Sequence, residues 1–124
     1  MVFLINVEFF GEGLEAFMKN TIKENREFRY CYKRGKKIVS SYIVLHYAKN
    51  RTEQNKLGIT VAKLRTAVER NRAKRLIREC YRAQFKEIRG GYNIVIVARS
   101  KMADATFKDV YNSLAYCIRK SDLI

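Results

Sequence analysis

The sequence is poor in residues that interrupt or cross-link a chain, with no proline, six glycines, three cysteines and one histidine among its 124 residues. The cysteines form no CxxC pair and have a single histidine as their only soft companion. Neither a zinc site nor a disulfide framework is therefore readable. With 48% apolar residues and no repeat, the chain is long enough for one compact domain and too short for two good cores. A reducing cytoplasm is the expected compartment.

Acidic residues are also scarce. Lysine and arginine number 26 against 12 aspartates and glutamates, which gives a net charge of +14. A field of this sign attracts phosphate-rich polymers, so nucleic acid is the leading expected partner and an anionic membrane surface the second. The few carboxylates are scattered, and Asp104, Asp109 and Asp122 lie on or beside one C-terminal segment. This arrangement disfavours a nuclease that holds its own metal ions.

Basic residues are absent from the first 17 positions, MVFLINVEFFGEGLEAF, which include three glutamates. Residues 18–124 hold all 26 basic residues against nine acidic ones, a net charge of +17. The apolar run in this segment is interrupted by Glu8, and no basic region precedes the run. The segment is therefore a poor match to a signal peptide, and its apolar run is too short to span a membrane. We interpret residues 1–17 as an N-terminal extension, a frayed tail or sequence upstream of a usual start at Met18. An extra edge strand or a partner-binding tail is the alternative.

Helix starts are marked by three threonines that each stand three residues before a carboxylate, in TIKE, TAVE and TFKD. This reciprocal capping pattern predicts helices over about 22–34, 67–86 and from 107 onward. The last helix carries residues at the three- and four-residue spacing of one face. We assign that stripe to the core: Phe107, Val110, Tyr111, Leu114 and Ile118.

Strands are predicted by β-branched and aromatic runs at 37–49, 56–63 and 92–99. The first run is long enough for one bent strand or two short ones. The last is almost continuously apolar, as in a central strand covered on both faces. The polar linker 50–55 is consistent with a hairpin between the second and third strands. The order αβββαβα predicts one α+β sandwich, a sheet with helices packed against it.

The segment ERNRAKRLIRECYR, residues 69–82, contains five arginines and one lysine. At about 100° per residue, its apolar residues gather on one side of the helix. The opposite side carries a stripe about 16 Å long, formed by Asn71, Arg75, Arg78 and Arg82. A solvated helix face normally mixes charges of both signs, whereas arginine can grip phosphate oxygens with two parallel hydrogen bonds. The stripe therefore predicts a surface for a polyanion.

This segment resembles the arginine-rich helix of the bacterial ribonuclease P protein component. The family's Arg-Asn-Arg, Lys-Arg and apolar pair match Arg70, Asn71, Arg72, Lys74, Arg75, Leu76, Ile77 and Arg78. Three further segments resemble the family in the same order: 22–35 its first helix, 56–63 the strand before the signature and 91–99 its last strand. The resemblance extends over residues 20–120, so we identify residues 18–124 as a ribonuclease P protein domain.

The resemblance implies a protein subunit that assists a catalytic RNA in endonucleolytic removal of the 5′ leader from precursor transfer RNA. The RNA subunit is then expected to hold the catalytic Mg²⁺, and no catalytic residue or metal site is expected on the protein. The implied partners are ribonuclease P RNA and precursor transfer RNA, without a membrane, while the oligomeric state is left open. The resemblance also implies a left-handed crossover through the helix between the last two strands, against the general steric preference.

Site residues follow from the same resemblance. The implied contacts with the RNA subunit are Lys63, Arg70, Asn71, Arg72, Lys74, Arg75, Arg78 and Arg82. Leader binding is implied for Phe28, Tyr32 and His46, although the spacing of Phe28 and Tyr32 alone is equally typical of core packing. His46 stands where the family commonly has tyrosine, and its imidazole can still stack on a base or donate a hydrogen bond.

A second departure from the family is the turn before the signature, which is one residue shorter and has Arg65 near the position of a family glycine. Loss of that glycine removes an easy left-handed conformation. Among other functions, a ribosomal or other structural RNA-binding protein fits the charge equally well, and only the order of the segments argues against it. DNA binding is less favoured, because no short helix precedes the arginine-rich one at helix-turn-helix spacing.

Overall fold

The computed structural model describes residues 22–123 with the exception of 23, 85 and 87. Its secondary structure confirms the predicted order αβββαβα, with one short 3-10 helix, η2, added before the last helix. The elements are α2 (Asn25–Arg34), β1 (Lys36–Val39), β2 (Ile43–Lys49), β3 (Lys56–Thr60), α3 (Ala67–Gln84), β4 (Tyr92–Ala98), η2 (Ser100–Asp104) and α4 (Phe107–Lys120). The run 37–49 thus forms two strands.

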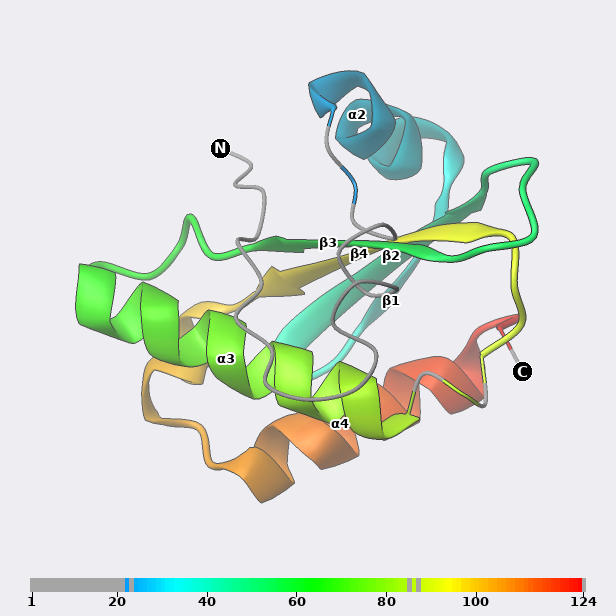
Figure 1. Cartoon of the computed structure of the whole chain (residues 1–124). Helices are drawn as coiled ribbons and strands as arrows, with labels where there is room; N and C mark the ends of the chain where they lie inside the picture. Colours follow the sequence, from blue (N-terminus) through cyan, green and yellow to red (C-terminus); the bar gives the residue numbers. More distant parts are fainter. Residues whose placement is uncertain (1–21, 23, 85, 87, 124) are drawn as a thin grey trace.

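The four strands form one mixed sheet in the spatial order β1-β2-β4-β3 (Figure 1). β1 and β4 both pair antiparallel with β2, whereas β3 pairs parallel with β4. The prediction that β4 is a central, doubly covered strand is confirmed. The predicted hairpin between β2 and β3 is wrong, because β4 lies between them. A strand that is apolar on both faces is best buried in the middle of a sheet, where helices cover both faces. β4 takes that place between β2 and β3, which prevents β2 and β3 from pairing with each other.

Adjacent parallel strands need a crossover connection, because the chain must return to the same end of the sheet. Between β3 and β4 this connection contains α3, which packs on the sheet together with α4. Figure 1 shows α3 and α4 on one face of the sheet and α2 alone on the other. The molecule is therefore a three-layer sandwich with one thick and one thin helical layer.

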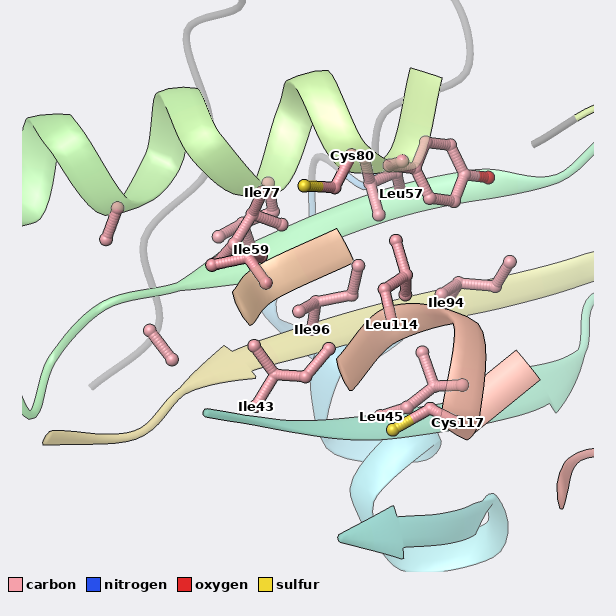
Figure 2. Close-up of a cluster of buried hydrophobic side chains, with 14 of the residues drawn as sticks. Ile43, Leu45, Leu57, Ile59, Ile77, Cys80, Ile94, Ile96, Leu114 and Cys117 are labelled. Carbon is pink, nitrogen blue, oxygen red and sulfur yellow. The ribbon is translucent and has the colours of Figure 1, made fainter. Parts of the chain in front are cut away.

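The two faces of the sheet build two hydrophobic clusters. The larger lies under α3 and α4 and contains alternate residues of β2, β3 and β4 (Figure 2). Its central side chains are Ile43, Leu45, Leu57, Ile59, Ile77, Cys80, Ile94, Ile96, Leu114 and Cys117. The smaller lies under α2 and contains Ile22, Phe28, Cys31, Ala48 and Val95. This small cluster supplies the buried apolar contacts between α2 and the sheet in the described part of the chain.

Two of the three predicted capping boxes are confirmed. At α3, the Thr66 and Glu69 side chains exchange hydrogen bonds with each other's backbone N–H groups, at 3.1 and 3.2 Å. Thr106 and Asp109 do the same at α4. The third box was wrong in its position: α2 begins at Asn25 after the N-cap Glu24, and Thr21 lies outside the described residues. The Ile22 backbone N–H donates to the Leu57 carbonyl at 3.0 Å, which ties this residue to β3 instead of a helix.

The apolar stripe of α4 is only partly core. Val110, Leu114 and Ile118 are buried as predicted, whereas Phe107 and Tyr111 are 44% and 37% exposed. The buried face is rotated relative to the predicted stripe, since it also includes Ser113 and Cys117. Phe107 and Tyr111 lie at the margin of that face, and their rings pack against each other with centroids 5.8 Å apart.

Candidate nucleic-acid interface

The predicted polyanion-binding stripe on α3 is divided by the structure. Asn71, Arg75 and Arg82 are exposed, as the helical spacing predicts. Arg78 is only 8% exposed, and its Nε donates to the Lys74 carbonyl at 3.3 Å. Arg78 therefore lies along its own helix, and the exposed stripe is carried by the other three side chains.

The two arginines of the Arg-Asn-Arg signature contact backbone carbonyls. Arg70 Nη1 donates to the carbonyls of Leu64 and Arg65, at 3.2 and 3.0 Å. Arg72 reaches the η2 segment, where it donates to the Met102, Ala103 and Ala105 carbonyls. Since a guanidinium has five N–H donors, these bonds orient each fork without using all of its capacity. The signature thus also connects the N-terminal part of α3 to the preceding turn and to the segment that leads into α4.

Lys63 is exposed in the turn before α3, and Lys74 is half-buried on the helix. The turn does not need the family's glycine. Apart from glycines, the one described residue with a positive φ is Arg51, in another loop. The turn is instead closed by the Leu64 N–H, which donates to the Val61 carbonyl at 3.1 Å, and the buried Leu64 side chain anchors it.

The expected leader-binding residues lie at the contact between α2 and the sheet. Tyr32 and His46 are both half-buried, and their rings meet edge to face with centroids 4.7 Å apart. Phe28 is fully buried in the cluster under α2. The structure therefore brings Tyr32 and His46 together at the surface and places Phe28 beneath them, where its ring supports this surface and is not exposed for stacking.

His46 is electrostatically unusual for a surface histidine. Burial, followed by the positive charge of Lys37 on the neighbouring strand, lowers the pKa of the imidazole. Its Nδ1 atom is buried without a hydrogen-bond partner in the described part of the chain. Burial also raises the pKa of the Tyr32 hydroxyl. The pair is thus held neutral near pH 7, and its two perpendicular rings form an aromatic contact suited to an uncharged base.

Sequence reasoning missed one surface. A hollow of about 550 Å³ lies beside the start of α2 and is lined mainly by basic and polar residues: Arg26, Glu27, Tyr30, Lys49, Asn50, Arg51, Lys56 and Asn93. The signal for it in the sequence is the cation-rich stretch around 49–56, which we interpreted only as a turn. No helix within the described ranges is long and apolar enough to cross a membrane, and no group of three potential metal ligands occurs there.

The fold and these surfaces define a class of protein: a small, basic α+β RNA-binding protein with a cationic helix and an aromatic contact surface. A family model described as Ribonuclease P matches residues 18–122. The chain belongs to the ribonuclease P protein family, whose members are subunits of the endoribonuclease that matures the 5′ end of transfer RNA. Membership implies an RNA subunit as partner.

Individual relatives agree with this assignment. The chain is 39% identical to the ribonuclease P protein component of Clostridioides difficile, over 82% of this chain and 91% of the relative. It is 34% identical to that of Alkaliphilus metalliredigens, over 85% and 96%. A solved Staphylococcus aureus RNase P protein superposes with a TM-score of 0.76 at 31% identity, over 84% and 96%. The Thermotoga maritima protein gives 0.74 at 29%, over 82% and 97%.

Deletion of residues 1–17 is expected to leave both stability and RNA processing close to those of the full chain. The deletion removes no basic residue, and it retains Ile22, whose side chain is buried and whose N–H bonds to β3. The comparison to make is the melting temperature and the leader-removal rate of the two proteins, each reconstituted with ribonuclease P RNA. A large fall in either quantity would show that the extension is part of the functional fold.

Proposed function

We propose that this chain binds two RNAs at once: ribonuclease P RNA through the exposed stripe of α3, and the 5′ leader of precursor transfer RNA through Tyr32 and His46. The observation that carries the proposal is the neutral edge-to-face pair between α2 and β2. It lies on the α2 side of the sheet, whereas α3 covers the other side (Figure 1). Separate faces allow separate RNA contacts.

The proposed role of this chain is to position the precursor transfer RNA, and the proposed location is the cytoplasm. Mg²⁺ held mainly by the RNA subunit supplies the hydrolytic chemistry, and the residues of this chain bind and orient the substrate. Aromatic surfaces stack on unpaired bases with little dependence on sequence. Because Nδ1 of His46 is buried, the neutral imidazole is left with Nε2, which can donate or accept one hydrogen bond at the edge of a base. Binding of the leader would raise the affinity of the complex for precursor over mature transfer RNA.

Replacing Tyr32 with alanine is expected to weaken binding of the holoenzyme to precursor transfer RNA by about 1–3 kcal/mol, the usual contribution of one stacked base. Affinity for mature transfer RNA, which lacks the leader, should be nearly unchanged, as should affinity for the RNA subunit. The measurement is the dissociation constant of the reconstituted holoenzyme for each RNA, at fixed salt concentration.

A matched control is Tyr116→Ala, because Tyr116 is an exposed tyrosine on α4, which lies on the opposite face of the sheet from α2 (Figure 1). It should change none of the three affinities. If Tyr32→Ala weakens precursor and mature transfer RNA equally, Tyr32 does not bind the leader and the proposal fails at this residue.

A further inference from the structure

The hollow beside the start of α2 lies on a different flank of the helix from the Tyr32 and His46 pair. Tyr30 lines the hollow, and two residues along a helix it points about 160° away from Tyr32. Tyr30 is also 53% exposed, more than any other described tyrosine. The hollow is therefore separate from the proposed leader contact, although both are built on α2 and β2.

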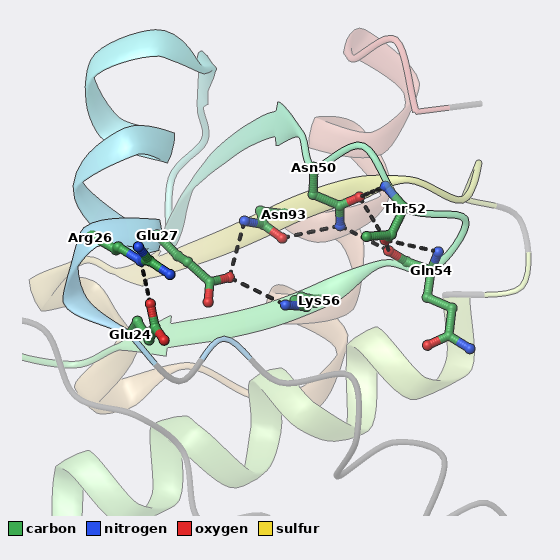
Figure 3. Close-up of polar contacts among 8 residues, drawn as sticks. All are labelled: Glu24, Arg26, Glu27, Asn50, Thr52, Gln54, Lys56 and Asn93. Atoms are coloured by element: carbon green, nitrogen blue, oxygen red, sulfur yellow. Dashed lines mark hydrogen bonds and ion pairs between the residues drawn. The ribbon is translucent and has the colours of Figure 1, made fainter.

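The loop 50–55, which forms one wall of the hollow, is held in a single shape by its own polar groups (Figure 3). The Asn50 side chain bonds the Thr52 N–H, the Thr52 hydroxyl and the Gln54 carbonyl at 2.8–2.9 Å. It also donates to Asn93 Oδ1 on β4 at 3.1 Å. On the other side, the Asn55 side chain accepts from the Tyr92 N–H at 2.9 Å. The loop is thus pre-organised although it contains no apolar anchor.

This arrangement holds Arg51 in a left-handed backbone conformation, with φ of 63°. Long side chains are uncommon there, and asparagine or glycine would adopt it more easily. Arg51 is exposed and lines the hollow. An arginine kept at a position that costs backbone energy is best explained by a function of its side chain.

The charges around the hollow favour an anion. Its lining includes four cations, Arg26, Lys49, Arg51 and Lys56, against a single carboxylate, Glu27, and Arg26 is also paired with Glu24 beside the hollow. Glu27 Oε2 lies 3.6 Å from Lys56 Nζ and accepts from Asn93 Nδ2 at 3.4 Å, which fixes this carboxylate within the wall (Figure 3). A cationic hollow with an exposed aromatic ring is the combination by which proteins hold unpaired nucleic acid, phosphates on the cations and a base on the ring.

We propose that this hollow binds unpaired nucleotides of the leader, upstream of those held at Tyr32 and His46; the inference rests on the proposed function. His46 and Arg51 are five residues apart along β2 and the start of the next loop, at most about 17 Å, so a strand leaving one contact reaches the other. Two cations flank that path: Lys37, which pairs with His46 across β1 and β2, and Lys49 at the end of β2, which lines the hollow. The leader is favoured over a loop of the RNA subunit because the same helix and strand form both contacts.

The test uses the reconstituted holoenzyme with Arg51→Asn and Tyr30→Ala as separate variants. Lys108→Gln is the control for the lost charge, because Lys108 is an exposed cation on α4. Substrates are precursor transfer RNA with a long leader, the same RNA with a leader cut to end within the Tyr32 contact, and mature transfer RNA. Tyr30→Ala should weaken long-leader binding by about 5- to 150-fold. Arg51→Asn should weaken it and make its salt dependence shallower by about 0.7, one single-strand phosphate.

Neither variant should change affinity for the short-leader precursor, mature transfer RNA or the RNA subunit alone. Arg51→Asn should melt at or above the temperature of the unaltered protein, because asparagine relieves the backbone strain. Unchanged long-leader affinity in both variants, alongside a loss in Tyr32→Ala, overturns this inference and leaves the proposed function standing. If Tyr30→Ala or Arg51→Asn lowers affinity for the RNA subunit, the hollow binds that RNA and the inference is overturned. If Lys108→Gln weakens long-leader binding as much as Arg51→Asn does, the effect is one of overall charge, which also overturns the inference.

Discussion

Replacing Phe28 with alanine is expected to lower the free energy of unfolding by about 3–5 kcal/mol, the usual cost of deleting a buried aromatic ring. The Phe28 ring is fully buried in the small cluster that joins α2 to the sheet. It lies on Gly58 of β3, where an added Cβ would come within 2.5 Å of Cε1 and 2.6 Å of Cζ. Because α2 has so few other apolar contacts, the helix should loosen as well. Denaturant unfolding of the isolated protein measures the loss.

Two further variants separate packing from RNA contact. Phe28→Leu keeps an apolar side chain in the cluster and should cost much less than alanine. Gly58→Ala should destabilise the protein although it adds apolar surface, since its methyl group would displace the ring from below. If Phe28→Ala has the same free energy of unfolding as the unaltered protein but a lower affinity for the leader, the Phe28 ring contacts RNA directly and its assignment to the core is wrong.

Replacing Arg75 and Arg82 together with alanine is expected to weaken binding to the RNA subunit by at least about 100-fold, because each of the two lost hydrogen bonds to a charged group contributes about 1.5–3 kcal/mol. Both side chains are exposed on the stripe of α3, whereas Arg78 is buried along the helix. The dependence of log affinity on log salt concentration should become shallower by about 0.7–0.9 for each lost phosphate contact. Titration of ribonuclease P RNA at several salt concentrations yields both quantities.

The control for this pair removes the same charge from α4, with Arg119→Ala and Lys120→Ala, which are also exposed. If both double variants lose affinity and salt dependence equally, the effect is one of net charge. If the α3 variant keeps both while remaining folded, the stripe does not carry the affinity. Arg70 and Arg72 are unsuitable for this test, because their bonds to backbone carbonyls would also be lost.

The local structure was readable from the sequence wherever a short-range pattern decides it. Thr66 and Thr106 start helices because their caps need only a carboxylate three residues later. The unbroken apolar run of β4 predicted a central strand, since only a strand covered on both faces can bury it. The order of the elements, the family resemblance and three of the four residues of the basic stripe follow from the chain in the same way, whereas Arg78 is buried.

The tertiary structure alone decided what depends on residues distant in sequence. β2 and β3 are separated by β4, a strand more than thirty positions further along the chain, and no turn signal reports that competition. Phe28 is buried and Tyr32 half-exposed, although both share a helix, because the Phe28 ring lies on Gly58 of β3 whereas the Tyr32 ring lies against His46 of β2. Arg51 lines a hollow because Asn93 of β4 helps to hold its loop. Helical and strand periodicity tell which side chains share a face, whereas burial of each one depends on what the rest of the fold places opposite it.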